Sequence, residues 1–145
     1  MKLTEFIPLA PRSKKMMYFA TTSVSAGEPS EICTELEQID LAEYITSGRS
    51  GFYMIRANGD SMEYEIRNGD WLITDRNLAP QSGDIIVASI NGDYVVKDYK
   101  ASQNGVLLVP KNEKYKPRII TQNDDFEIFG VVVGKSVVER FRKSE

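Results

Sequence analysis

From residue 52 onward, the chain consists of short runs rich in β-branched and aromatic residues, and turn residues separate these runs. Branched and aromatic side chains fit the pleated surface of a strand, so each run predicts a strand. No long amphipathic segment lies between the runs that could carry the chain across a parallel sheet, which favours a mainly β, compact antiparallel domain. The predicted strands cover residues 52–57, 70–75, 84–90, 93–99, 105–110 and 127–141.

One dipeptide predicts how two of these strands pair. Asn91-Gly92 stands between residues 84–90 and 93–99. Both central residues of a type I′ turn take positive φ, which Asn and Gly adopt more readily than other residues. The two strands are therefore expected to form an antiparallel hairpin.

The first 31 residues lack a sustained period of two or of 3.6, and they contain three of the six prolines. We expect a mobile N-terminal arm over residues 1–31 and one domain over residues 32–145. Within the arm, the apolar run at residues 16–20 could dock on a surface or serve only as a packing anchor. Residues 39–45 have apolar side chains at helical spacing, which predicts one short helix with Asp40 as its cap.

Composition excludes several classes of site. The 145 residues, 41% of them hydrophobic, are enough for one domain core. There is no histidine, so a Ser-His-Asp triad, a Cys-His dyad and any histidine-ligated metal are excluded. Cys33 is the only cysteine, which excludes an intramolecular disulfide, a Cys-X-X-Cys pair and a cysteine-rich zinc site. We expect a cytoplasmic location and no metal or other cofactor.

The charge balance and the hydropathy pattern argue against nucleic-acid and membrane partners. The 18 basic and 21 acidic residues leave a net charge of −3, so no overall field would hold a phosphate backbone. Direct DNA binding is not expected, although a local basic patch stays an open alternative. No run approaches the roughly 18 apolar residues that span a bilayer, and prolines and charges interrupt the N-terminal stretch where a signal peptide is apolar.

The tetrapeptide GDSM at residues 59–62 follows the first predicted strand, and Gly69-Asp70 opens the next one. Ser61 thus lies on a turn at a strand end, where its hydroxyl is exposed and main-chain N–H groups can stabilise an oxyanion. Taken alone, a Gly-Asp-Ser sequence is more often an ordinary turn.

Lys97 lies in an apolar strand, in the sequence Tyr94-Val95-Val96-Lys97. Alternate side chains of a strand share a face, so Lys97 points with Val95. If that face is buried, desolvation lowers the pKa of Lys97 from about 10.4 and makes the neutral amine available as a general base. A solvated lysine on an outer face is the ordinary alternative.

The third feature is the segment SVSAGEP at residues 23–29. It is extended in character and places the small residue Ala26 directly before Gly27, so it can enter a narrow cleft as a substrate. Without the other two features, the segment is an ordinary linker.

Together these features resemble the self-cleaving LexA/UmuD family of serine-lysine peptidases (the S24 family) in order and spacing. Gly27 and Ser61 are 34 positions apart, and Ser61 and Lys97 are 36 positions apart. The resemblance extends over residues 22–140. Its parts are the Ala-Gly cleavage site at 24–29, the UmuD-like connecting segment at 37–41, the nucleophile box at 59–62 with 69–70, and the base-carrying strands at 83–86 and 95–97.

The resemblance implies a LexA-like peptidase fold and a specific set of roles. Ser61 attacks the Ala26 carbonyl, and neutral Lys97 accepts the serine proton. The main-chain amides of Asp60 and Ser61 form the oxyanion hole. The reaction is peptide-bond hydrolysis through an acyl-enzyme, in which Lys97 returns the proton to the Gly27 amine.

The resemblance also implies partners in the SOS response to DNA damage. Only 26 residues precede Gly27, too few for a three-helix DNA-reading domain, which favours the UmuD branch and a role in translesion synthesis. The implied partners are a second copy of the chain, a RecA-single-stranded DNA filament and a UmuC-like Y-family DNA polymerase. The homodimer could use the apolar strand at residues 130–138.

Several alternatives stay open at this point. The segment EYEIRN at residues 63–68 lacks the glycine pair common in the UmuD branch, so a LexA-like, phage-repressor-like or orphan S24 peptidase is an alternative. Signal peptidase I also uses serine and lysine but needs membrane segments. A non-catalytic dimerising module is the alternative outside the enzymes, and the presence of both Ser61 and Lys97 argues against it.

Overall fold

The computed structural model describes residues 2–8, 16–20 and 36–139. The chain divides into two compact units, one formed by residues 1–8 and 51–145 and the other by residues 9–50. The predicted boundary between an arm at residues 1–31 and a domain at 32–145 stays a prediction, because most of that arm lies outside the described residues.

In the smaller unit, β2 (Met16–Ala20) pairs antiparallel with β3 (Leu36–Asp40), and α1 (Leu41–Thr46) follows directly. The Asp40 side chain accepts a hydrogen bond from the Glu43 N–H at 3.2 Å, which confirms the predicted cap. The helix begins two residues later than predicted because Ile39 and Asp40 belong to β3. The apolar run at residues 16–20 forms β2, a strand that its composition alone did not predict.

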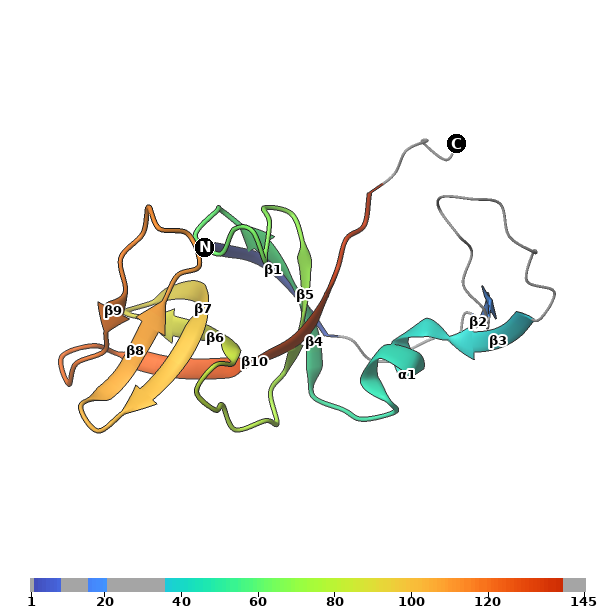
Figure 1. Ribbon diagram of the computed structural model, residues 1–145. Helices are drawn as coiled ribbons and strands as arrows, with labels where there is room; N and C mark the ends of the chain where they lie inside the picture. Colours follow the sequence, from blue (N-terminus) through green and yellow to red (C-terminus); the bar gives the residue numbers. More distant parts are fainter. Residues whose placement is uncertain (1, 9–15, 21–35, 140–145) are drawn as a thin grey trace. The chain divides into compact units, whose positions relative to one another are not determined.

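The larger unit is a single antiparallel sheet over its described residues, which confirms the predicted mainly β fold (Figure 1). Its eight strands follow the order β1-β4-β5-β10-β6-β7-β8-β9. Six of them match predicted runs, whereas β1 and the two-residue β9 were not predicted. The strands are β1 (Lys2–Pro8), β4 (Phe52–Asn58), β5 (Trp71–Asp75), β6 (Ile85–Ile90), β7 (Asp93–Ser102), β8 (Gly105–Val109), β9 (Arg118–Ile119) and β10 (Phe126–Ser136).

The hairpin predicted from Asn91-Gly92 is present. Strands β6 and β7 pair antiparallel, with Val87 opposite Val96 and Ile86 opposite Lys97. Asn91 and Gly92 have φ values of 50° and 91°, as a type I′ turn requires.

Strand β10 lies between β5 and β6 and joins the two halves of the sheet (Figure 1). Its register shifts between Ile128 and Gly130, and Gly130 packs directly against β5. A Cβ atom at Gly130 would lie 2.8 Å from the Asp75 carbonyl oxygen and 2.9 Å from Thr74 Cγ2. Only glycine therefore allows the two strands to approach this closely.

Two clusters of buried apolar side chains form the core of this unit. In the first cluster, Ile55, Leu72, Val87 and Val96 come from four different strands, and Met62 comes from the loop between β4 and β5. The loop that contains Ser61 is therefore anchored in the core.

We predict that Gly130→Ala lowers the free energy of unfolding by about 1–3 kcal/mol, because the added methyl group overlaps the β5 backbone. Gly134→Ala on the same strand is the matched control, since its Cβ would meet only Ile73 Cδ1 at an ordinary 3.7 Å. Denaturant unfolding of both variants checks this. Equal stabilities would contradict the close approach at Gly130.

Candidate active site

Residues 59–70, the Ser61 loop, connect β4 to β5 and are tied to the sheet at both ends. The Gly69 N–H donates to the Ala57 carbonyl at 2.8 Å, and the Ala57 N–H donates to the Asp70 carbonyl at 2.8 Å. Met62 and Ile66 are buried and point into the core. The backbone around Ser61 is thus fixed by main-chain hydrogen bonds and by apolar burial.

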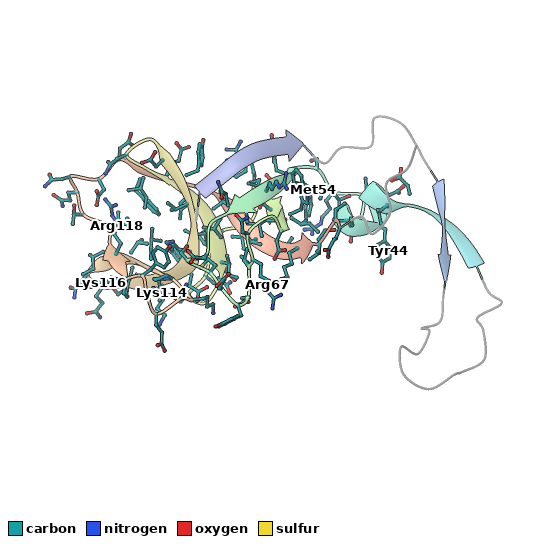
Figure 2. The ribbon with its side chains drawn as sticks, turned by 90° about the horizontal axis from the view of Figure 1, so that it is seen from above. Tyr44, Met54, Arg67, Lys114, Lys116 and Arg118 are labelled. Carbon is teal, nitrogen blue, oxygen red and sulfur yellow. The ribbon has the colours of Figure 1, made fainter. Side chains whose placement is uncertain are left out.

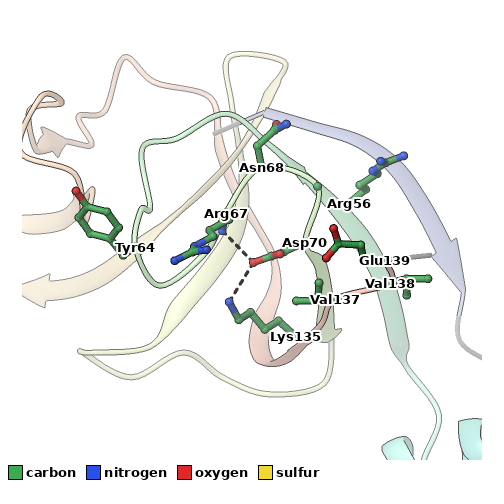
Figure 3. A pocket seen from close by; sticks show the side chains of 10 residues that line it. Arg56, Tyr64, Arg67, Asn68, Asp70, Lys135, Val137, Val138 and Glu139 are labelled. Atoms are coloured by element: carbon green, nitrogen blue, oxygen red, sulfur yellow. Dashed lines mark hydrogen bonds and ion pairs between the residues drawn. The ribbon is translucent and has the colours of Figure 1, made fainter. Parts of the chain in front are cut away.

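Lys135 of β10 holds the far end of the Ser61 loop, as Figure 3 shows. The buried Asp70 carboxylate accepts hydrogen bonds from the Arg67 N–H at 2.9 Å and from Lys135 Nζ at 3.0 Å. Lys135 Nζ also donates to the Glu65 carbonyl at 2.8 Å. Arg67, Asp70 and Lys135 border a surface pocket of about 510 Å³ that neither Ser61 nor Lys97 lines.

Ser61 and Lys97 meet although 36 positions separate them. Lys97 Nζ lies 2.7 Å from Ser61 Oγ, within hydrogen-bonding distance. Ser61 is only 1% exposed, so the prediction of an exposed hydroxyl was wrong, because the loop that contains Ser61 packs into the core through Met62. On β7, the neighbouring Val96 side chain is buried in the first core cluster, and Lys97 is on the opposite face with Val95. Strand β7 thus places the Lys97 amine beside the Ser61 hydroxyl.

The surroundings of Lys97 change its acid-base properties. Burial lowers the pKa of Lys97 from its ordinary value of 10.5, because desolvation penalises the charged ammonium. A charged ammonium donates a hydrogen bond to Ser61 Oγ, whereas a neutral amine can accept the hydroxyl proton. A lysine with a lowered pKa beside a serine is an arrangement suited to general-base catalysis.

A second segment, residues 110–115, braces the Ser61 loop from the other side. The Ser61 carbonyl accepts from the Lys111 N–H at 2.9 Å and from the Asn112 N–H at 3.0 Å. Asn112 Nδ2 donates to the Asp60 carbonyl at 3.0 Å, and the Tyr115 hydroxyl donates to the Asp60 carboxylate. We call residues 110–115 the bracing loop.

The bracing loop is itself tied to the sheet and to the Ser61 loop. Lys111 Nζ lies 2.8 Å from the Asp98 carboxylate on β7 and 3.3 Å from the Glu65 carboxylate. The hydrogen bond to Asp98 is the main reason why the pKa of Lys111 is raised.

Three exposed basic residues, Lys114 at the end of the bracing loop and Lys116 and Arg118 after it, lie along the outer edge of the unit (Figure 2).

The structure places the predicted site residues unevenly. Ser61, Lys97 and the main chain of Asp60 lie together, whereas Ala26 and Gly27 lie outside the described residues. Sequence reasoning missed Asn112 and Tyr115. They are 52 and 55 positions from Asp60, and no local pattern links residues at that separation.

Comparison of the whole sequence with known protein families identifies the family of this chain. The Peptidase S24-like family matches residues 17–133 of the chain. The chain belongs to this family. S24 peptidases are serine proteases with self-cleavage, and they include relatives of the LexA/UmuD type, so the predicted family is confirmed. The narrower UmuD branch stays a prediction.

The relatives that match this chain include LexA repressors and protein MucA. Protein MucA of Salmonella typhimurium is 35% identical over 117 residues, covering 79% of this chain and 80% of MucA. The LexA repressor of Carboxydothermus hydrogenoformans is 36% identical over 115 residues, covering 77% of this chain and 55% of the repressor. LexA repressor 2 of Pseudomonas syringae pv. tomato is 31% identical over 125 residues, covering 86% and 62%.

The chain spans between 44% and 62% of the length of these LexA repressors and of the one from Desulfatibacillum aliphaticivorans. It matches most of MucA. Within residues 2–8, 16–20 and 36–139, no helix combines the length and the apolarity that crossing a bilayer requires.

Proposed function

We propose that this S24 peptidase hydrolyses its own Ala26-Gly27 bond, with Ser61 as nucleophile and Lys97 as general base. One observation carries the proposal: a buried serine hydroxyl lies 2.7 Å from the amine of a lysine whose pKa burial has lowered. The absence of histidine from the chain supports it further, because the usual partner of a catalytic serine is missing.

The proposed reaction consists of acylation, in which Ser61 attacks and the Gly27 amine leaves, and deacylation, in which water hydrolyses the ester. Neutral Lys97 takes the Ser61 proton while Oγ attacks the Ala26 carbonyl carbon, and the N–H groups of Asp60 and Ser61 stabilise the oxyanion. The intermediate then breaks its bond to the Gly27 nitrogen, which leaves with the proton from Lys97. Water, deprotonated by Lys97, hydrolyses the resulting ester of Ser61 with Ala26 and regenerates the enzyme.

Because substrate and site belong to one chain, the scissile bond is present at high effective concentration. The rate is then set by how often the segment around Ala26-Gly27 reaches Ser61. A partner that favours the docked state would accelerate cleavage without touching the chemistry. We propose that a RecA-single-stranded DNA filament is that partner, as the family resemblance implies.

The proposed biological role is in the SOS response to DNA damage. The match over 80% of MucA supports a UmuD-like role, in which a homodimer of the processed chain assists a UmuC-like Y-family polymerase in translesion synthesis. The comparable identity to LexA repressors supports a second candidate, a repressor-like peptidase. Pull-down with the processed chain distinguishes them: retention of a Y-family polymerase supports the first role, and its absence supports the second.

We predict that Ser61→Ala and Lys97→Ala each reduce self-cleavage at least about 100-fold, since each removes one half of the proton transfer. Lys97→Arg should be equally inactive, because a guanidinium stays protonated. Intact mass spectrometry after incubation at alkaline pH detects the fragment that begins at Gly27.

Two exposed or partly exposed positions outside the proposed dyad supply matched controls. Lys100→Ala removes a lysine from the same strand, and Ser89→Ala removes a serine from β6. Both should cleave at the rate of the unaltered chain. A Gly27 fragment that persists at that rate in Ser61→Ala or Lys97→Ala would sink the assignment of those residues.

We predict that the self-cleavage rate rises about tenfold per pH unit and then levels off below pH 10.5, because only the neutral form of Lys97 accepts a proton. The lowered pKa moves the midpoint down and so increases the neutral fraction at neutral pH. First-order rate constants measured across pH test this. A rate that falls as pH increases from neutral would contradict a lysine base.

A further inference from the structure

The Asp60 carbonyl oxygen receives a hydrogen bond from outside its own loop. Asn112 Nδ2 donates to it at 3.0 Å across 52 positions of sequence. The Glu63 N–H also donates to this oxygen, at 3.1 Å, as part of the local turn. Asn112 therefore connects the bracing loop to the peptide unit that precedes Ser61.

That peptide unit is the one that carries the Ser61 N–H. A peptide unit is planar, and in its trans form the carbonyl and the N–H point in opposite directions. The bond between Asp60 and Ser61 is trans. Fixing the direction of the Asp60 carbonyl therefore also fixes the direction of the Ser61 N–H, without any contact to that N–H.

The next peptide unit is held from the same loop. The Ser61 carbonyl accepts from the N–H groups of Lys111 and Asn112 at 2.9 and 3.0 Å. Both carbonyls that flank the Ser61 side chain are thus bound to the bracing loop. Of these bonds, the one from Asn112 Nδ2 comes from a side chain, so a substitution can remove it.

We propose that Asn112 is a positioning residue that aims the Ser61 N–H at the oxyanion formed during cleavage. The inference rests on the proposed peptidase function, in which this N–H stabilises the oxyanion. Donors aimed in advance at a developing charge make a large contribution to rate, so a rotated peptide unit lowers the rate even when Ser61 and Lys97 are intact. Asn112 acts through the backbone and touches no reacting atom.

The two ends of the Asn112 side chain have separable tasks. Oδ1 accepts from the Lys114 N–H at 3.0 Å, which shapes the bracing loop, whereas Nδ2 donates to Asp60. Asn112→Asp keeps an oxygen for Lys114 and removes the donor. Asn112→Ala removes both without adding charge. Comparing these two variants therefore separates an effect on the shape of the bracing loop from an effect on the orientation of the Asp60-Ser61 peptide.

The experiment measures first-order self-cleavage of the full chain by mass spectrometry across alkaline pH. Asn112→Asp and Asn112→Ala should both lower the plateau rate by at least about tenfold, since misdirecting an oxyanion donor costs part of its roughly 100-fold contribution. In the uncharged Asn112→Ala, the midpoint of the pH profile should stay at its original value, because Lys97 is unaltered. Asn104→Asp, in the exposed turn between β7 and β8, is the control for the added charge.

Two results would overturn the proposal. If Asn112→Asp cleaves at the original plateau rate, the donor has no role and only the shape of the loop matters. If Asn112→Ala moves the midpoint and keeps the plateau, the residue acts on the Lys97 base and not on the peptide unit. Failure of the proposed function looks different, because then the unaltered chain and Asn104→Asp also produce no Gly27 fragment.

Discussion

The contact between Lys97 Nζ and Ser61 Oγ is the interaction on which the rest of the site depends. A 2.7 Å separation joins a buried hydroxyl to an amine whose charged form is disfavoured by burial. The fold provides both the short distance between the two side chains and the burial that lowers the pKa of Lys97. Strand β7 carries Lys97 on the face opposite Val96, and the burial of Met62 and Ile66 holds the Ser61 loop against the same sheet. In the proposed mechanism, packing makes a lysine available as the general base in a chain that has no histidine.

Contacts from two other segments of the chain hold the Ser61 loop. Lys135 of β10 binds its distal end through Asp70 and the Glu65 carbonyl, and the bracing loop binds its proximal end at Asp60 and Ser61. Catalytic geometry needs this support, because small displacements of a nucleophile or of an oxyanion donor cost much of the rate. In the proposed reaction, regulation would then act on the docking of the substrate segment and would leave the Ser61 loop unchanged.

Much of this arrangement could be predicted from sequence, and the reason differs from element to element. The strands β4 to β8 and the Asn91-Gly92 hairpin have local signals, namely β-branched and aromatic runs and residues that tolerate positive φ. Ser61 and Lys97 were found because a family resemblance connects positions that are distant in sequence. Strands β1 and β9 depend on their partners for stability, and the roles of Asn112 and Tyr115 depend on how two loops meet. No period or motif encodes such contacts.

The proposed mechanism depends on burial to make Lys97 a base at Ser61. The most direct test is an NMR titration of the Lys97 side chain in Ser61→Ala, a variant that should stay uncleaved at alkaline pH. The Lys97 signal is assigned as the one that disappears in the double variant Ser61→Ala/Lys97→Arg. Because desolvation is the main cause of the lowered pKa, the shift should persist in this variant, and we expect a midpoint clearly below 10.5. A midpoint at or above 10.5 would contradict it.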